Sequence, residues 1–180
     1  MKILAVQSKM GIGDTVIFLP FIKALYKKYN SPISLLIKES SKAEEYLDQT
    51  EYIDKIIFLE RNNKNINRHS GILGTFNLIK DIKKHKFEKI FIFNSSVRFN
   101  IIAKFSGIPE VYQYPLFKKY KQHITNTPKK FLKDKLGIDV NEDPEIQIND
   151  NSISQSTSKF LINNDNTNIL LGIGGSGPTK

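Results

Sequence analysis

The chain contains no cysteine and only three histidines, and no apolar run in it reaches the roughly 18–20 residues that a membrane-spanning helix needs. The absence of cysteine excludes disulfides, thiolate metal sites and a cysteine nucleophile. The opening residues, MKILAVQSKMGIGD, also lack the long apolar region and the small-residue cleavage site of a signal peptide. They are typical of a first buried strand instead.

The composition indicates a globular protein with a basic surface. Hydrophobic residues make up 39% of the 180 residues and charged residues 25%, which suits one α/β domain with a core and a short remainder. The net charge of +9 favours anionic partners such as nucleic acid, anionic lipid head groups or phosphorylated sugars. A general richness in lysine, asparagine and isoleucine explains much of this charge without any partner.

Strand-like apolar runs alternate with helical patterns at intervals of about 30 residues. Strands are expected at 2–7, 32–37, from 53, at 89–93 and from 110, and helices at 15–29, from 41, at 72–86, from 97 and at 129–136. This alternation predicts an α/β fold, a Rossmann-like parallel sheet with helices on both faces. Ligands of such sheets bind at the carboxyl ends of the strands.

Three details of the helices can be checked against a structure. Asp14 stands where the N-cap of the first helix belongs, and Pro20 predicts a kink or a late start of that helix. In the helix at 72–86, the spacing favours an inward face made of the apolar side chains Leu73, Phe76, Ile79 and Ile82.

The sequence predicts two domains of unequal completeness. Residues 1–150 form the predicted Rossmann-like domain, and residues 151–180 a linker helix, at 154–163, followed by the first strand and glycine-rich loop of a second domain. A helix should follow a strand and loop of the kind in NILLGIGGSGPTK, and none follows here. We therefore expect the chain to be truncated early in its second domain.

The loop MGIGDT, residues 10–15, is the first candidate site. The glycines Gly11 and Gly13 let backbone N–H groups approach a ligand, but Val16 stands where a dinucleotide fingerprint needs a third small residue. A carboxylate would repel phosphate, so Asp14 suits a different task, accepting a proton from a sugar hydroxyl. The simpler alternative is that Asp14 only caps the helix.

Other candidates follow the fourth strand, the fifth strand and the last predicted strand. Small hydroxyls and an arginine in NSSVR suit a sugar or carboxylate, through Ser95, Ser96 and Arg98. His123 lies in a lysine-rich stretch and could contact an anion, although a solvated histidine is the simpler interpretation. It has no second histidine or carboxylate at ligand spacing, so no metal site is expected. In GIGGSGPTK a diphosphate could be held by four residues, Gly175, Ser176, Thr179 and Lys180.

These motifs together resemble glycosyltransferase family 9, the ADP-heptose:lipopolysaccharide heptosyltransferases. The opening MKILAVQSKMGIGDTVIFLPFIKALYKKY resembles the family's first strand, Gly-Asp loop and Pro-containing helix. FEKIFIFNSSVRFNIIAKFSGIPEVYQY resembles its fourth-strand segment, and KQHITNTPKKFLKDKLGI its His-to-Leu-Gly connector. GIGGSGPTK resembles its donor loop, which normally continues to Lys-x-Trp-Pro. The MGIGDT loop is one residue longer than the commonest family form.

The resemblance implies the N-terminal half of a GT-B enzyme that transfers a heptose, or a related sugar, from a nucleotide-diphosphate donor such as ADP-heptose. No metal is implied. By resemblance Asp14 is the catalytic base, and Gly175, Ser176, Thr179 and Lys180 bind the donor diphosphate. Gly11, Gly13, Ser95, Ser96, Arg98 and His123 are the substrate-binding candidates. The implied acceptor is an anionic glycolipid of the lipopolysaccharide core, met by a cytoplasmic protein at the inner face of the membrane. The chain alone is expected to be inactive or nearly so.

Two other functions fit parts of the sequence. Glu39, near the end of the second strand, stands about where a Rossmann oxidoreductase places a ribose-binding acid, although the glycine pattern argues against an NAD(P) site. Lysine-rich helices would suit a basic nucleic-acid-binding module, but no DNA- or RNA-reading motif is present. The preferred prediction, a glycosyltransferase, therefore includes no nucleic-acid partner.

Overall fold

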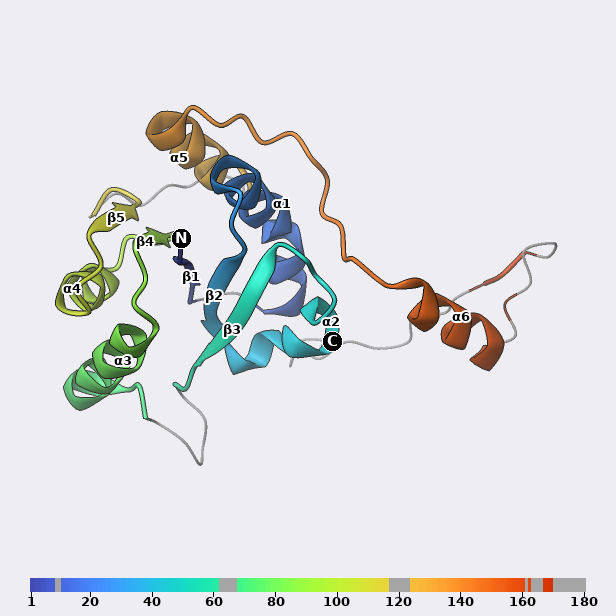
Figure 1. The fold of residues 1–180 in the computed structure, drawn as a ribbon, viewed down its shortest axis with the longest axis horizontal. Helices are drawn as coiled ribbons and strands as arrows, with labels where there is room; N and C mark the ends of the chain where they lie inside the picture. Colours follow the sequence, from blue (N-terminus) through green and yellow to red (C-terminus); the bar gives the residue numbers. More distant parts are fainter. Residues whose placement is uncertain (9–10, 62–67, 117–123, 161, 163–166, 170–180) are drawn as a thin grey trace, which may run out of the picture. The chain divides into compact units, whose positions relative to one another are not determined.

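The computed structural model describes residues 1–8, 11–61, 68–116, 124–160, 162 and 167–169 (Figure 1). The chain divides into two compact units, Met1–Gln147 and Ile148–Lys180. The first unit contains the whole sheet. The described part of the second contains the helix α6 (Asp150–Lys159), which begins at an N-cap Asn149 whose side chain accepts a hydrogen bond from the Ser152 N–H at 2.8 Å.

The first unit is built on one five-stranded parallel sheet, as the sequence predicts. The strand order is β3-β2-β1-β4-β5. The strands are β1 (Ile3–Gln7), β2 (Ile33–Lys38), β3 (Ile53–Leu59), β4 (Lys89–Ile92) and β5 (Glu110–Gln113). The three central strands are almost wholly buried, which explains why they read as continuous apolar runs.

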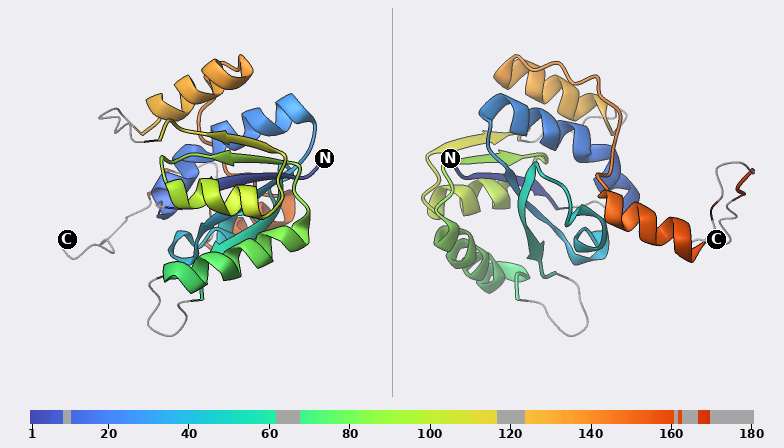
Figure 2. Two further views of the ribbon diagram at one scale, coloured as in Figure 1. Left: turned by 90° about the vertical axis from the view of Figure 1, so that its left-hand side faces the viewer. Right: turned by 45° about the vertical axis from the view of Figure 1, so that its right-hand side comes forward.

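Helices cover both faces of this sheet (Figure 2), which confirms the predicted Rossmann-like α/β fold. On one face, α1 (Ile12–Tyr29) and α5 (Asn126–Leu136) pack against Ile3 and Ala5. On the other, α3 (Gly71–His85) and α4 (Val97–Phe105) pack against Leu4 and Val6. The short helices η1 (Glu39–Ser41) and α2 (Glu44–Leu47) follow β2.

Two predictions about the helices are wrong, the second of them for two of its four residues. The helix α1 starts at Ile12 with Gly11 as its N-cap, so Asp14 is not the cap, and the helix continues through Pro20 to Tyr29. In α3, the predicted inward residues Ile79 and Ile82 do pack on the core, but Leu73 and Phe76 point to solvent, and Gly74 and Leu78 are buried instead. Apolar residues occupy more than one stripe of α3, and Gly74, which packs closely against the backbone of His69, belongs to the stripe that is buried.

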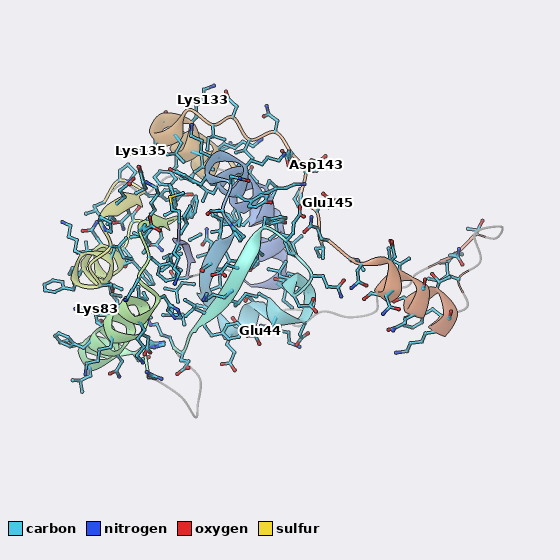
Figure 3. The ribbon with its side chains drawn as sticks, viewed as in Figure 1. Glu44, Lys83, Lys133, Lys135, Asp143 and Glu145 are labelled. Atoms are coloured by element: carbon cyan, nitrogen blue, oxygen red, sulfur yellow. The ribbon has the colours of Figure 1, made fainter. Side chains whose placement is uncertain are left out.

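An extended segment follows α5 and runs beside α1 (Figure 3). Lys23 of α1 forms an ion pair with Glu145 at 3.2 Å, and Lys27 forms one with Glu142. The Glu51 N–H also donates to the Gln147 side chain at 2.9 Å. This segment, expected to be a linker or an edge element, is therefore held to the first unit by polar contacts, and the helix after it begins at Asp150 rather than at 154.

Candidate active site at the carboxyl edge of the sheet

The carboxyl ends of β1 and β4 lie next to each other in the middle of the sheet. Val6 pairs with Ile92, and the Phe93 N–H donates to the Val6 carbonyl oxygen at 3.2 Å. From β1 the chain continues to β2 on one side, whereas from β4 it continues to β5 on the other. This is the point where the strand order reverses, which in open α/β sheets is where ligands bind.

Asn94, directly after β4, fixes the loop at this point. Its amide nitrogen donates to the Ser8 hydroxyl at 3.3 Å, and its side-chain oxygen accepts from the Ser96 N–H at 3.0 Å. Gln113 at the end of β5 donates to the carbonyl oxygens of Asn94, at 3.1 Å, and Ser96, at 2.9 Å. Asn100 donates in turn to the Gln113 side chain at 2.9 Å. These hydrogen bonds join the loop that carries the candidate serines to the ends of β1 and β5.

Ser8, Asn100 and Gln113 were not predicted as parts of this edge, and Asn94 was predicted there only as the first residue of NSSVR, with no role of its own. A usable signal was present, because Ser8, Asn94 and Gln113 are polar residues at the carboxyl ends of three neighbouring strands. The pairing between them depends on the strand order, which local sequence does not specify.

The start of α1 brings Gly11, Gly13 and Asp14 to the same edge. The N-cap Gly11 has no side chain with which to cap the helix, and the Thr15 hydroxyl donates to the Gly11 carbonyl oxygen at 2.7 Å. Asp14 is the third residue of the helix and its side chain is exposed. An exposed carboxylate beside a ligand-binding edge can accept a proton from a bound hydroxyl group.

Gly13→Ala tests whether this turn needs glycine for its backbone conformation, and the variant is expected to be at least as stable as the unmodified chain. A Cβ on Gly13 would meet no atom within 4 Å, and the position is helical, so alanine should raise the free energy of unfolding by up to about 1 kcal/mol. Urea denaturation at 25 °C measures the change. A loss of stability would show that this turn needs glycine for its backbone and not only for access by a ligand.

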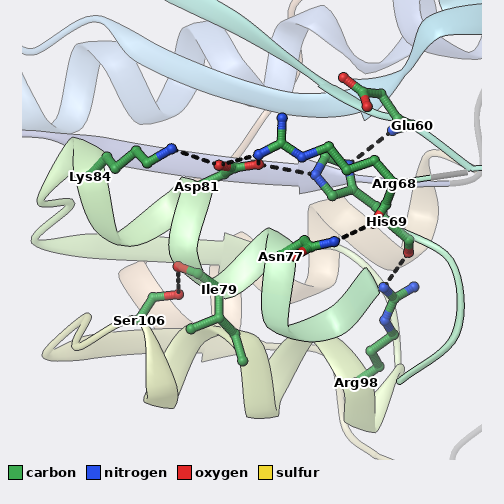
Figure 4. Close-up of polar contacts among 9 residues, drawn as sticks. All are labelled: Glu60, Arg68, His69, Asn77, Ile79, Asp81, Lys84, Arg98 and Ser106. Atoms are coloured by element: carbon green, nitrogen blue, oxygen red, sulfur yellow. Dashed lines mark hydrogen bonds and ion pairs between the residues drawn. The ribbon is translucent and has the colours of Figure 1, made fainter. Parts of the chain in front are cut away.

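Ser95, Ser96 and Arg98 follow β4, but the structure gives Arg98 a contact of a different kind. Ser96 is the N-cap of α4. The Arg98 Nε donates to the Thr75 hydroxyl at 2.9 Å, and its Nη2 donates to the His69 carbonyl oxygen (Figure 4). Burial, and secondarily the charge of Arg61, lower the pKa of Arg98. Two of its five donors thus join the start of α4 to the start of α3.

His69, for which no sequence pattern predicted a role, lies at the centre of a polar cluster beside this contact. His69 is buried; its Nδ1 accepts from the Glu60 N–H at 3.1 Å, and its Nε2 lies 3.3 Å from Asp81 (Figure 4). Because Nδ1 is an acceptor, the proton of the neutral ring is on Nε2 and faces the carboxylate. Arg68 and Lys84 also pair with Asp81, at 2.7 Å and 3.0 Å. The cluster ties residues 60 and 68–69 to α3.

Asp81→Asn is expected to lower the free energy of unfolding at pH 7 by about 1–2 kcal/mol. Burial alone would raise the pKa of Asp81, but hydrogen bonds from Lys84 and His69 and the charge of Arg68 outweigh it and lower the pKa below 3.8. A depressed folded-state pKa stabilises the fold above the unfolded pKa, and this contribution disappears as the pH falls through the folded value.

Urea denaturation at pH 7 and pH 3 checks this, since the variant should lose less stability on acidification than the unmodified chain. Asp139→Asn is the matched control, because its partner Lys133 is 2.9 Å away and both side chains are largely exposed. We expect the control to change stability by less than about 0.5 kcal/mol. Equal acid sensitivity of the Asp81 variant and the unmodified chain would contradict the prediction.

Several predicted site residues lie outside the described residues. They are His123 and the four residues of the predicted donor loop, Gly175, Ser176, Thr179 and Lys180. Among the described residues, no three histidine or acidic side chains gather closely enough to hold a metal ion. No helix in the same part of the chain has both the length and the apolar character needed to cross a membrane.

A cavity of about 160 Å³ lies where β5 ends and α5 begins. Tyr114 and Phe131 line it, and their rings are 5.0 Å apart. The charged residues of the lining are Lys130, Asp134 and Lys135. The Tyr114 N–H donates to the Ile92 carbonyl oxygen at 3.3 Å, which joins the cavity to the end of β4. Burial raises the pKa of Tyr114 above its usual range, so its hydroxyl stays protonated.

The sequence matches no protein-family model and no curated protein. Solved structures are similar in fold. A glycosyl transferase family 9 protein from Veillonella parvula DSM 2008 matches with a TM-score of 0.73 and 19% identity, over 99% of this chain and 55% of that one. ADP-heptose lps heptosyltransferase II of E. coli matches with a TM-score of 0.60 and 14% identity, over 91% of this chain and 52% of that one.

A third match is E. coli heptosyltransferase WaaC with ADP, at a TM-score of 0.54 and 10% identity, over 88% of this chain and 53% of that one. The chain thus spans about half the length of the structures it matches. The comparison confirms, at the level of fold, the resemblance to family 9 glycosyltransferases that the sequence indicates.

Proposed function

We propose that the protein is a glycosyltransferase that moves a heptose, or a related sugar, from a nucleotide-diphosphate donor to a lipopolysaccharide-core or similar glycan. The observation that carries this proposal is the likeness in fold to a family 9 glycosyltransferase over 99% of the chain. One of the similar structures, WaaC, was solved with ADP, which supports ADP-heptose as the donor to test first. The activity, substrates and partners of the whole protein are all part of this proposal.

Asp14 is the proposed general base. Its carboxylate takes the proton from an acceptor hydroxyl while the hydroxyl oxygen attacks the anomeric carbon of the donor sugar. The bond between that carbon and the diphosphate oxygen breaks, and the nucleoside diphosphate leaves with the bonding electrons. Two features support this role, the exposure of Asp14 and its place in the first turn of the helix that follows β1. The step requires no metal.

Substrate contacts are proposed for the loop after β1, which leads to Asp14, and for the loop after β4. The backbone of Gly11 and Gly13, with the hydroxyls of Ser95 and Ser96, would hold the acceptor sugar at the point where the strand order reverses. The guanidinium of Arg98 keeps further donors for such a contact beyond the two it gives to α3. His123 is proposed to contact an anionic group of the acceptor.

The donor diphosphate is proposed to bind to the loop that contains Gly175, Ser176, Thr179 and Lys180. Backbone N–H groups, two hydroxyls and one ammonium group suit a diphosphate. An anionic glycolipid acceptor, met by a cytoplasmic protein at the inner face of the membrane, is consistent with the net charge of +9.

A transfer assay with the full-length gene product tests the proposal. Radiolabelled ADP-heptose and a heptose-free lipopolysaccharide core are incubated with the protein, in the presence and absence of EDTA. We expect labelled core that EDTA does not reduce. No transfer to any core acceptor would overturn the proposal, and a saturable change in NADH fluorescence in the same preparation would favour an oxidoreductase instead.

A further inference from the structure

The outer helices α3 and α4 expose an unusual amount of apolar surface. In α3 the exposed fractions are 79% for Ile72, 79% for Leu73 and 57% for Phe76. In α4, Phe105 is 69% exposed, and two further apolar side chains are exposed, those of Val97 and Ile101. Single exposed apolar residues are ordinary, but a contiguous group of them marks a surface for interaction.

Helical geometry places these side chains on the faces directed away from the sheet. In α3, Leu78 and Ile82 point to the core, and the exposed apolar residues lie on the opposite side of the helix. In α4 the same holds, with Phe99, Ile102 and Ala103 turned inward. The two helices lie side by side (Figure 2), linked at Arg98–Thr75 and at Ser106–Ile79.

We call these six apolar residues, with the lysines beside them, the α3–α4 surface. Its lysines are all exposed and comprise Lys80, Lys83 (labelled in Figure 3), Lys84 and Lys104. The two helices contain one carboxylate, Asp81, and it is already paired with Arg68 and Lys84. The surface is therefore apolar and cationic together, with no free carboxylate.

This combination favours a membrane surface that carries anionic lipids. Apolar side chains of an interfacial helix enter the boundary between head groups and acyl chains, and lysines beside them meet anionic head groups. The long lysine stems can lie along the apolar surface while their ammonium groups reach the phosphates. The absence of free carboxylates removes the charge that an anionic leaflet would repel.

We propose that the α3–α4 surface docks this protein on an anionic membrane leaflet. The inference deepens the proposed function and rests on it for its purpose, because a glycolipid acceptor would be present in that membrane. The surface is built from the outer sides of two helices, whereas Asp14 lies at the carboxyl edge of the sheet, so docking and transfer can be measured separately.

Vesicle co-sedimentation of the 180-residue chain tests docking. Vesicles are phosphatidylcholine alone, or phosphatidylcholine with about one-third phosphatidylglycerol. We expect binding at least ~10-fold tighter to the anionic vesicles, weakening as salt is raised. The apolar variant is Leu73→Ser with Phe76→Ser and Phe105→Ser; the charge variant is Lys80→Glu with Lys83→Glu. Each should lose at least ~10-fold in affinity for the anionic vesicles.

The charge control is Lys129→Glu with Lys130→Glu, two exposed lysines on α5, which should bind within about twofold of the unmodified chain because the docking surface is intact. Circular dichroism checks that each variant is folded. Binding by the two surface variants as tight as that of the unmodified chain would overturn the inference, as would no preference for anionic vesicles. A dimer in sedimentation equilibrium that the apolar variant abolishes would assign the surface to self-association instead.

A failure of the docking surface can be told apart from a failure of the proposed glycosyltransferase activity. In the full-length gene product, transfer to a water-soluble core oligosaccharide does not need a membrane. Transfer to that acceptor without vesicle binding would overturn the docking surface alone. Vesicle binding without transfer to any acceptor would leave the surface in place and overturn the glycosyltransferase.

Discussion

Replacement of Asp14 by alanine in the full-length gene product is expected to lower turnover by at least ~100-fold. The acceptor hydroxyl is a poor nucleophile while it keeps its proton, and no other acidic side chain lies in the first turn of α1. Steady-state transfer of labelled heptose to a core acceptor measures the effect. The change should appear mainly in kcat, because a general base acts in the transition state more than in substrate binding.

Two variants separate this role from a structural one. Asp14→Asn keeps the size of the side chain and removes its ability to accept a proton, so it should be as inactive as the alanine variant. The side chain is exposed and does not cap the helix, so each variant should lose no more than about 1 kcal/mol of stability, the usual contribution of a carboxylate near a helix N-terminus. Unchanged turnover would leave Asp14 with that electrostatic contribution to α1 and nothing more.

The parts of the fold that were predictable are those that local pattern determines. Residues Ile3 to Val6 are buried on both faces, so they form a continuous apolar run that identifies a parallel strand. The start of α1 was harder to place, because Asp14 is a favoured N-cap type whereas Gly11, the true cap, has no side chain to signal it. Propensity could not choose between two positions three residues apart.

Each loop of the candidate site could be predicted separately from the sequence, but the contacts between the loops could not. The motifs after β1 and β4 were found from glycines, hydroxyls and Asp14, but their contact through Ser8 and Asn94 depends on the strand order. The cluster around His69 depends on Asp81, twelve residues away on α3, and periodicity gave no reason to pair them. The inward face of α3 was predicted only in part: Ile79 and Ile82 pack on the core, whereas Leu73 and Phe76 are exposed. Steps of three residues fall short of a full helical turn, so a series at that spacing drifts from one face of the helix to another.

Gly74→Ala is expected to lower the free energy of unfolding by about 2 kcal/mol or more, although alanine is the better helix former by about 1 kcal/mol. A Cβ on Gly74 would lie 2.2 Å from the carbonyl carbon of His69 and 2.8 Å from its oxygen, far inside any allowed contact. The His69 backbone cannot easily retreat, because its N–H donates to the Glu60 carbonyl oxygen at 3.0 Å and its own carbonyl oxygen accepts from Arg98.

Urea denaturation of Gly74→Ala and Gly13→Ala makes a matched comparison, since the same chemical change falls in the first turns of two helices. We expect opposite signs, because the Cβ at Gly13 meets open space and the Cβ at Gly74 meets backbone. The start of α3 must shift to relieve the clash, and it carries Ile72 and Leu73, so Gly74→Ala should also weaken binding to anionic vesicles. Unchanged stability of Gly74→Ala would mean that residues 68–69 give way without loss, and that the cluster around His69 does not fix the start of α3.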